Sequence, residues 1–509
     1  MTNANIINLF TNAAAEHSTQ IALIRNEEQI SYGELQQQVY DSAAYYRKQG
    51  IGKGDKVLVF VPMSIDLYRI VLALFHIGAC PVFLDEWVNR ERLKACCRHI
   101  PCEALIAGRK VLWASLLVRE LRQIPIRLAA QKRSKRTQAF DAVQVNEDDT
   151  ALITFTTGST GTPKAANRTH GFLHAQFNEL RPMLDNAFNP SLITLPIVVL
   201  INLALGKATI LPPKGFKVKD TTTTQLLADA ARQHAAETLV LSPALLNEVA
   251  TRLANDTPTT QRIRSILTGG GAMFPEQAMR IQEVFSTTEA LVVYGSTEAE
   301  PISHIAVSQL AKATADEVYQ RGLPVGMPVA SIQVAVVPYT NEPIAPQDEA
   351  AWKALQLPQG QVGEIAVAGA HVLRGYVNNP EAEQATKVNV AGTTWHRTGD
   401  AGTIDNTGQL HLYGRCTETL YLNGNAHYPM LVAYAFRMMT GTRQAALLMH
   451  RDRLTLVVAP KQPIDEARLQ PALEQLGLAT ATIVYLDHIP TDPRHATKTD
   501  TEALRVLLG

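Results

Sequence analysis

The sequence predicts a two-domain α/β protein. We expect a large N-terminal domain of layered αβ sheets that includes a small β subdomain, followed by a small α+β C-terminal domain. Two observations lead to this prediction. The chain has 509 residues, of which 46% are hydrophobic. A chain of this length exceeds what a single hydrophobic core usually supports. The pattern of predicted helices and strands also changes twice, after Pro324 and again after Arg415.

Helices and short buried strands alternate before Pro324. Apolar positions recur at helical spacing from Tyr32 to Gly50, and Lys56–Val61 (KVLVFV) is typical of a buried strand that precedes a second helix ending near Ile77. The alternation returns at Ala151–Phe155, Thr238–Leu241, Ser265–Leu267 and Ala290–Val293. Turn residues or a helix follow each of these runs, as a layered α/β domain requires.

Two further patterns follow. After Pro324, short strands such as GEIAVAG and TGQLHLYGR, separated by Gly, Pro and Asn turns, indicate a more open β region. Beyond Arg415 we expect a strand, a helix at about Tyr428–Met439, strands at Ala445–Met449 and Leu454–Val458, a helix and a final strand. The predicted domains are therefore residues 1–415 and 416–509.

Composition excludes several kinds of partner. Basic residues (Lys and Arg) and acidic residues (Asp and Glu) each number 47. The chain as a whole therefore lacks the net positive charge that binds nucleic acid or an anionic membrane. The one basic run, Lys132–Arg136, is typical of a solvated loop. Five cysteines without paired ligand spacing indicate reduced thiols. Since neither a secretory leader nor a run of about 18 apolar residues is present, we expect a cytoplasmic protein without a transmembrane segment.

The strongest local signal is a loop rich in Thr and Gly that directly follows a predicted strand. It consists of Thr156, Thr157, Gly158, Ser159, Thr160, Gly161, Thr162, Pro163 and Lys164. The glycines let backbone N–H groups approach an anion, the hydroxyls add donors, and the lysine adds a charge, so the loop can wrap phosphates. It is not a P-loop, because Pro163 precedes the lysine and Ala165 follows it. Taken alone, the loop could also be a flexible surface turn.

Two other clusters follow apolar strands, where open α/β sheets bind ligands. The clusters are Tyr294, Gly295, Ser296, Thr297 and Glu298, and Thr268, Gly269, Gly270, Gly271 and Ala272. Tyr294 can stack on a base, Thr297 can donate to a phosphate, and Glu298 offers Mg²⁺ a hard oxygen. Consecutive glycines allow the backbone to approach a flat ligand. In isolation, an ordinary strand-to-helix turn with Ser296 or Thr297 as the helix cap explains the first cluster better. Loop flexibility remains an alternative for the second cluster.

A third cluster contains His396, Arg397, Thr398, Gly399 and Asp400, and Gly414 and Arg415 follow it after a strand-like stretch. A carboxylate only accepts hydrogen bonds, so Asp400 suits the two hydroxyls of a ribose. By itself, however, an aspartate at the end of a strand is more often a turn residue.

In combination, TFTTGSTGTPK, YGSTE, TGD and LYGR resemble the adenylate-forming superfamily of acyl-CoA synthetases, adenylation domains and luciferases. The resemblance runs from ISYGEL at Ile30 through GKGDKV and RGYVNNPEA to Lys498. It implies a small C-terminal domain that rotates against the large one. It also implies an enzyme that uses ATP and Mg²⁺ to convert a carboxylic acid into acyl-AMP with release of pyrophosphate.

The resemblance implies an ATP site as well. The implied ATP-binding residues are Thr156, Thr157, Gly158, Ser159, Thr160, Gly161, Lys164, Gly269, Gly270, Gly271, Ala272, Tyr294, Gly295, Ser296, Thr297, Asp400 and Arg415. Of these, the Thr156–Lys164 loop would hold the β- and γ-phosphates, and Gly269–Ala272 with Tyr294 would frame adenine. Asp400 and Arg415 would engage the ribose and its surroundings.

The implied catalytic residues are Lys498, Glu298 and Thr297. Thr297 would contact phosphate, Glu298 would bind Mg²⁺, and Lys498 would be the mobile lysine that reaches the α-phosphate and the substrate carboxylate. A carboxylate and a phosphate repel each other, and Mg²⁺ with a desolvated lysine offsets this repulsion. Composition alone would make Lys498 an ordinary exposed lysine.

The loop PRHATK, with Arg494 and His495 before Lys498, looks like the β-lactone synthetases of olefin biosynthesis. The likeness continues in THGFLHAQ, LINLALG and YGSTEAEPIS. Those enzymes adenylate a long-chain 2-alkyl-3-hydroxy acid, and the hydroxyl of that acid then displaces AMP.

The chain departs from the family pattern at the hinge, where Thr417 stands two residues after the arginine in place of an acidic residue or a lysine. It departs again in NGNAHYPMLVAYAF, where Leu431 and Ala433 replace an acidic pair. Ala165 replaces the glycine that usually follows the loop lysine. These departures weaken the expectation of efficient thioester formation and leave the adenylation residues intact. The expected acyl pocket includes Ile197, Val198 and Val199, which favour an aliphatic acid. Plain core packing explains those three residues equally well.

The predicted function is ATP-dependent activation of a fatty or 3-hydroxy fatty acid, followed by transfer of the acyl group to coenzyme A. The first alternative is a β-lactone synthetase, and the second is a non-catalytic protein that binds nucleotide or an acyl ligand. A nicotinamide oxidoreductase ranks last, because no GxGxxG turn follows a strand. The sequence makes no prediction about the oligomeric state.

Overall fold

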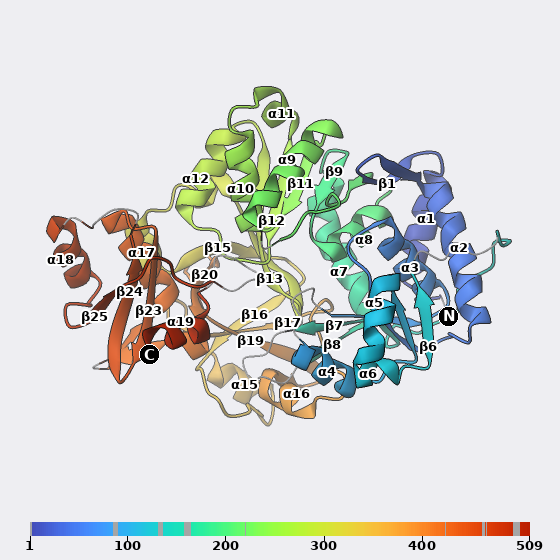
Figure 1. The fold of residues 1–509 in the computed structure, drawn as a ribbon. Coiled ribbons are helices and arrows are strands. Elements are labelled where there is room, and N and C mark those ends of the chain that lie inside the picture. The colour runs from blue at the N-terminus through green and yellow to red at the C-terminus, as the bar shows by residue number, and fades with distance from the viewer. Residues whose placement is uncertain are drawn as a thin grey trace.

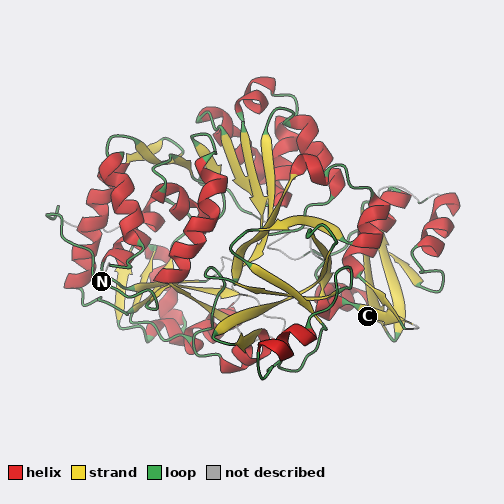
Figure 2. Cartoon of the chain, turned by 180° about the vertical axis from the view of Figure 1, so that it is seen from behind, coloured by secondary structure: helices red, strands yellow, loops and turns green. Residues whose placement is uncertain are grey.

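Two large β-sheets occupy the centre of the N-terminal part, and helices cover them (Figures 1 and 2). The chain was analysed as a computed structural model, which describes residues 3–84, 90–130, 136–156, 164–218, 220–422, 424–460, 464, 466–491 and 499–509. Within these ranges, none of the helices has the length and apolar character needed to cross a bilayer.

The first sheet has six strands in the order β6-β5-β3-β4-β7-β8. The bounds are β3 Lys56–Phe60, β4 Cys80–Phe83, β5 Ala104–Ala107, β6 Ile126–Ala129, β7 Thr150–Thr156 and β8 Lys164–Thr169. All neighbours in this sheet are parallel except β7 and β8. Parallel strands need crossover connections, and helices supply several of them. The predicted strand at Lys56–Val61 is therefore confirmed as β3 in the middle of a sheet.

The second sheet has fourteen strands and joins a parallel half to an antiparallel half. The bounds are β1 Ile21–Arg25, β2 Glu28–Ser31, β9 Ser191–Ile193, β10 Thr209–Ile210, β11 Thr238–Leu241, β12 Ser265–Gly269, β13 Glu289–Ser296, β14 Ala299–Ala306, β15 Leu323–Pro328, β16 Gln333–Val337, β17 Gly363–Ala368, β18 Lys387–Val390, β19 Thr393–Ile404 and β20 Leu410–Arg415. Strands β9, β11, β12 and β13 are parallel, and β13 turns back into antiparallel β14. This change of direction matches the predicted change from layered α/β to open β structure.

Helices pack on both sheets. The bounds in the N-terminal part are α1 Ile7–Glu16, α2 Tyr32–Lys48, α3 Ile65–His76, α4 Arg90–His99, α5 Arg109–Ala114, α6 Arg119–Arg122, α7 His170–Asp185, α8 Pro196–Ala204, α9 Thr224–Gln233, α10 Pro243–Leu253, α11 Thr257–Arg262, α12 Pro275–Val284, α13 Val307–Leu310, α14 Ala315–Arg321, α15 Glu349–Leu355 and α16 Pro380–Thr386, with 3₁₀ turns at Ser115–Leu117 (η1), Thr221–Thr223 (η2) and Cys416–Glu418 (η3). The predicted helices that end near Gly50 and Ile77 are confirmed as α2 and α3. A capping box between Ser31 and Glu34 begins α2, because each side chain bonds the backbone N–H of the other.

A smaller body follows β20 at the C-terminal end (red in Figure 1). Its bounds are β21 Leu420–Leu422, β22 Asn425–His427, α17 Pro429–Thr440, β23 Gln444–His450, β24 Arg453–Ala459, α18 Glu466–Gln475, β25 Thr482–Tyr485 and α19 Thr501–Leu508. Strands β23, β24 and β25 form one sheet, whose core with α17 includes Phe436 and Leu456. The predicted order of elements is correct except at the end. The chain finishes in a helix, which Asp500 caps, and this helix is too short to stand out beside the polar stretch before it.

Candidate active site

The short segment Val372–Val377 connects the two large sheets. An isolated bridge pairs Tyr376 with Ala166 of β8, and another pairs Val372 with Ala299 of β14. The backbone N–H of Val377 also donates to the carbonyl of Ala165 at 2.8 Å. Residues at the start of β8 and at the β13–β14 turn are therefore held on either side of one segment.

Glu298 lies in the β13–β14 turn and is fixed from that segment. The hydroxyl of Tyr376 donates to Glu298 Oε1 at 2.9 Å, and the N–H of Leu373 donates to the Glu298 carbonyl at 2.6 Å. Burial raises the pKa of Tyr376 strongly, and the nearby Glu298 raises it further. The phenol therefore stays protonated and acts as a donor to the carboxylate.

Lys164 begins β8 and faces the same tyrosine. Its Nζ lies 5.8 Å from the centre of the Tyr376 ring. Burial lowers the pKa of Lys164, Glu298 raises it, and Arg415 lowers it. The structure thus brings Lys164 and Glu298 into one electrostatic environment, as the sequence analysis expected. Thr156 ends β7, whereas the predicted phosphate-loop residues Thr157–Gly161 lie outside the described part of the chain.

Asp400 lies between Tyr294 and Arg415, so three of the predicted site residues meet. The Tyr294 hydroxyl donates to Asp400 Oδ2 at 2.7 Å, and Arg415 Nη1 lies 3.0 Å from Asp400 Oδ1. Asp400 and Arg415 face each other across β19 and β20. Burial raises the pKa of Tyr294 well above its ordinary value, and Asp400 adds to the effect. The charge of Asp400 also raises the pKa of Arg415.

The glycines of the predicted site serve different purposes. A Cβ on Gly269 would lie 2.9 Å from the Val293 carbonyl oxygen, and one on Gly295 would lie 2.8 Å from the Ala299 carbonyl oxygen. Both are therefore needed for the close packing of β12, β13 and β14. Gly270 has a φ of +80° and no atom within 4 Å of a Cβ, so its backbone is open to a ligand. Gly271 and Ala272 follow it before α12.

The β13–β14 turn combines ordinary turn chemistry with the site. The Ser296 hydroxyl accepts a hydrogen bond from the Glu298 N–H at 3.2 Å. Thr297 lies between them, and its carbonyl accepts a bond from Arg168 Nη2 at 3.3 Å. The alternative of a strand-to-helix turn with Ser296 or Thr297 as helix cap is wrong, because antiparallel β14 follows β13 and Ser296 bonds within a hairpin.

A buried ion pair supports the strand that carries Asp400. Arg397 Nε and Nη2 donate to Glu364 Oε2 at 2.8 and 2.6 Å, and both side chains are 4% exposed. The other oxygen, Glu364 Oε1, accepts the N–H of Gly399 at 3.0 Å. Since Gly399 has a φ of +74°, this contact fixes a left-handed turn directly before Asp400.

Sequence reasoning missed Lys387, which begins β18 and is buried. Its Nζ donates to the Leu373 carbonyl and lies 5.5 Å from the Tyr376 ring centre. Burial lowers the pKa of Lys387 to about 7, with Glu298 and Glu383 opposing the shift and Lys164 adding to it. The only hint in the sequence is a lysine at the start of an otherwise strand-like run, KVNV.

Sequence reasoning also missed a group of polar side chains that extends from the turn at Thr297 into the protein interior. Arg168 is buried in β8, and its Nε has no hydrogen-bond partner among the described residues. Burial lowers the pKa of Arg168 and Glu300 raises it, while burial raises the pKa of Glu300 and Arg168 lowers it. Gln176 Nε2 donates to Glu300 Oε2 at 3.4 Å. We call Arg168, Glu300 and Gln176 the buried polar chain.

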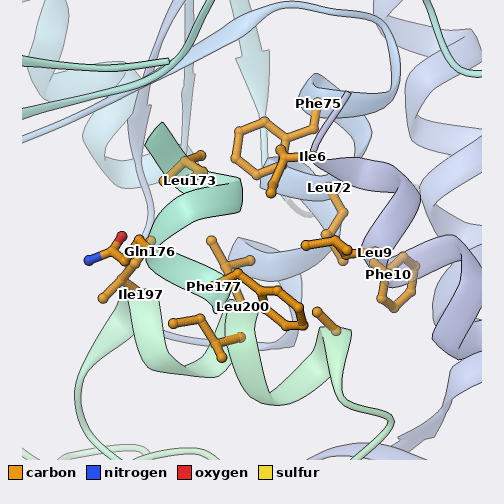
Figure 3. Close-up of a pocket in the computed structure, with 12 residues that line it drawn as sticks. Ile6, Leu9, Phe10, Leu72, Phe75, Leu173, Gln176, Phe177, Ile197 and Leu200 are labelled. Atoms are coloured by element: carbon orange, nitrogen blue, oxygen red, sulfur yellow. The ribbon is translucent and has the colours of Figure 1, made fainter. Parts of the chain in front are cut away.

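The buried polar chain ends at an apolar cavity between α1, α3, α7 and α8 (Figure 3). The cavity is lined by Ile6, Leu9, Phe10, Leu72, Phe75, Leu173, Gln176, Phe177, Ile197, Leu200, Ile201 and Ala204, and it has a volume of about 40 Å³. Ile197 and Gln176 lie together at one end. Of the expected acyl-pocket residues, Ile197 lines the cavity, while Val198 and Val199 are buried in the surrounding core.

The donor groups near Tyr376 suit Mg²⁺ bound together with a polyphosphate. Within the described residues, no three His, Cys, Asp or Glu side chains gather closely enough to hold a metal ion by themselves. Magnesium commonly takes only one or two carboxylates and completes its shell with phosphate oxygens and water. Glu298 supplies such a carboxylate opposite Lys164.

The fold and the site define the class of protein: an α/β protein in which Lys164 and the carboxylates of Glu298 and Asp400 gather where two sheets meet. The chain belongs to the AMP-binding enzyme family, whose model matches residues 10–377. The predictions of this family and of an ATP-dependent adenylate-forming ligase are thereby confirmed.

Relatives and solved structures are similar over nearly the whole chain. Olefin beta-lactone synthetase of Stenotrophomonas maltophilia is 28% identical over 94% of this chain and 91% of that protein. The protein of the same name from Xanthomonas campestris pv. campestris is also 28% identical, over 94% and 90%. The structure of ATP-bound MatB from Rhodopseudomonas palustris covers 99% of both chains with a TM-score of 0.81 at 20% identity. This similarity confirms the predicted fold class.

Replacement of Tyr376 by Phe tests the fixation of Glu298. The variant keeps the ring beside Lys164 and Lys387 but removes the hydrogen bond to the carboxylate. A hydrogen bond to a charged group contributes about 1.5–3 kcal/mol, so we expect ATP–pyrophosphate exchange at limiting Mg²⁺ to fall roughly 10- to 100-fold. Tyr339→Phe is the matched control, since that hydroxyl donates to the exposed Asn341. Equal rates for Y376F and the wild type would contradict the proposed role.

Replacement of Arg397 by Met tests the buried ion pair. The change leaves Glu364 as an unpaired buried charge, and we expect the free energy of unfolding to fall by about 3–5 kcal/mol. The double variant R397M/E364L should recover part of this loss, because no isolated charge remains while the Gly399 N–H loses its acceptor. Denaturant unfolding followed by circular dichroism measures both. A single variant as stable as the wild type would refute the assignment.

Proposed function

We propose that this enzyme activates an aliphatic 3-hydroxy acid as its acyl adenylate and then closes a β-lactone with the hydroxyl of the same acid. The observation that carries the first step is the convergence of Lys164 and Glu298 on Tyr376, next to Asp400 and Arg415. A cation, a carboxylate that suits Mg²⁺ and a carboxylate that suits a ribose are the groups required to hold ATP.

In the first step, a substrate carboxylate oxygen attacks the α-phosphorus of ATP, and the bond from that phosphorus to pyrophosphate breaks. Lys164 and the Thr156–Gly161 loop would hold the β- and γ-phosphates. Mg²⁺ on Glu298, with Thr297 beside it, would neutralise charge on the phosphates. Lys498, outside the described residues, would reach the α-phosphate and the attacking carboxylate.

The nucleoside would lie at the ends of β12, β13 and β19. Adenine would meet the backbone from Gly269 to Ala272, where Gly270 is open, and the ring of Tyr294 with Gly295 and Ser296 beside it. The ribose hydroxyls would bond Asp400. Because Tyr294 and Arg415 hold both Asp400 oxygens, the carboxylate is oriented before the nucleotide arrives, which reduces the reorganisation needed on binding.

In the second step, the 3-hydroxyl oxygen attacks the acyl carbonyl carbon, the bond to AMP breaks, and the hydroxyl proton leaves to solvent or to the departing phosphate. The two relatives named beta-lactone synthetase support lactone formation as the second step. Transfer to coenzyme A is the competing ending. Thr417, Leu431 and Ala433, which depart from the pattern of thioester-forming relatives, disfavour it.

A product assay decides between the endings. The full chain is incubated with ATP, Mg²⁺ and a panel of aliphatic acids with and without a 3-hydroxyl, in the presence and absence of coenzyme A. We expect acid-dependent pyrophosphate–ATP exchange and, from 3-hydroxy acids without coenzyme A, a product lighter than the acid by one water in mass spectrometry. An acyl-coenzyme A product without lactone would replace the second step. Absence of exchange with every acid would refute the first step, and Lys498→Ala should abolish exchange while ATP binding persists.

Gln176 is expected to recognise the 3-hydroxyl. Its side chain is 1% exposed, its Oε1 has no partner among the described residues, and it stands at the end of the apolar cavity. An unpaired buried acceptor is costly, and a substrate hydroxyl would satisfy it. Gln176→Met keeps the shape and removes the acceptor, so the preference for 3-hydroxy over 3-deoxy acids in exchange should fall about tenfold or more. Leu173→Met, on the same cavity wall, should leave the preference unchanged. An unaltered preference in Q176M would contradict the assignment.

A further inference from the structure

Large apolar side chains project into solvent beside the edge of the six-stranded sheet. Trp113 is 77% exposed, Leu116 45% and Leu117 79%. They lie on the continuous run formed by α5 and η1, which packs next to β6 on the side of the molecule away from the C-terminal body (Figure 1). Three large apolar residues within five positions form a patch, whereas single exposed residues are common and require no explanation.

The three exposed side chains belong to a run, α5 and η1, that is itself packed firmly on the protein. Val111 and Leu112 of the same helix pack against the hydrophobic core beneath it. Ser115 is buried and donates to the Leu112 carbonyl at 2.6 Å, and Arg127 of β6 donates to both residues. The backbone under Trp113 and Leu117 is thus anchored to the sheet, so their outward direction follows from the fold.

The same surface is basic in a chain that is neutral overall. From Ala104 to Ala130 the sequence carries five basic residues and a single acidic one, Glu120. Glu120 is itself paired with Arg98 of α4 at 3.4 Å. The exposed cations of this stretch are Arg109, Lys110, Arg119 and Arg122. In the described part of the chain, no salt bridge joins any of these four to a carboxylate.

We propose that Trp113, Leu116 and Leu117, with Arg109, Lys110 and Arg119 around them, dock this protein reversibly on an anionic lipid bilayer. Tryptophan and leucine enter the interfacial zone of a bilayer, while arginine and lysine bind the anionic headgroups above it. The local positive charge, whose one acidic neighbour within the stretch is Glu120 paired with Arg98, complements such a surface. The neutral remainder of the chain keeps the attachment weak. The proposal is independent of the reaction assigned to the active site.

Vesicle sedimentation with the full chain tests the proposal. We expect binding to phosphatidylglycerol–phosphatidylcholine vesicles at least tenfold stronger than to phosphatidylcholine alone, and weaker binding as salt rises, because salt screens exposed charges. Both W113S/L117S and R109E/K110E should lose at least tenfold in binding. Their pyrophosphate–ATP exchange in solution should equal that of the wild type, which also reports that they fold.

Matched controls separate this surface from general effects of charge and hydrophobicity. M279S/V506S removes two other exposed apolar side chains, and K214E/K312E reverses two other exposed cations. Neither should alter vesicle binding. Wild-type protein that ignores anionic vesicles, or controls that lose as much binding as the patch variants, would overturn the proposal. So would a W113S/L117S variant that changes the sedimenting mass of the protein without changing vesicle binding, because the patch would then be an interface between proteins.

Discussion

The active site depends on one tyrosine that links two sheets. Lys164 begins a strand of the first sheet and Glu298 follows a strand of the second, so neither sheet alone brings them together. Tyr376 bonds Glu298 through its hydroxyl and lies beside Lys164 and Lys387 with its ring, while its backbone pairs with β8. Movement of this segment would separate the lysine from the carboxylate, and the fold therefore sets the distance between opposite charges.

Charged side chains are buried around this link, and contacts with the protein compensate two of them. Glu364 is held by Arg397, and Lys387 donates to the Leu373 carbonyl. Burial of unpaired ions would cost several kcal/mol each, so these contacts are required for a stable fold. They also keep fixed dipoles and charges near the place where a highly charged nucleotide would bind. Groups oriented by the fold need little reorganisation when charge develops during a reaction.

Local sequence sufficed where an element depends on its own neighbours in the chain. Thr238–Leu241 was predicted as a strand with its observed bounds, and Glu298 was selected because it follows such a strand. Lys387 and Gln176 could not be selected this way. Their hydrogen-bond partners, Leu373 and Glu300, are distant in the sequence and lie on other elements. Helix α19 was missed because its pattern is short. Long-range contacts thus define the part of the site that sequence patterns do not reveal.

Aromatic, ionic and apolar contacts attach the C-terminal body to the N-terminal part. Phe274 of α12 stacks on Tyr434 of α17 with ring centres 4.4 Å apart, and Arg437 reaches Glu276 at 2.8 Å. A partly exposed ion pair of this kind contributes only about 0–1 kcal/mol. Leu431 and Tyr434 of α17 are also buried in the hydrophobic core that contains Ala278 and Ile281 of α12. The rotation that the family resemblance implies would therefore have to replace this apolar packing with other contacts, because a large hydrophobic interface holds two domains in one arrangement.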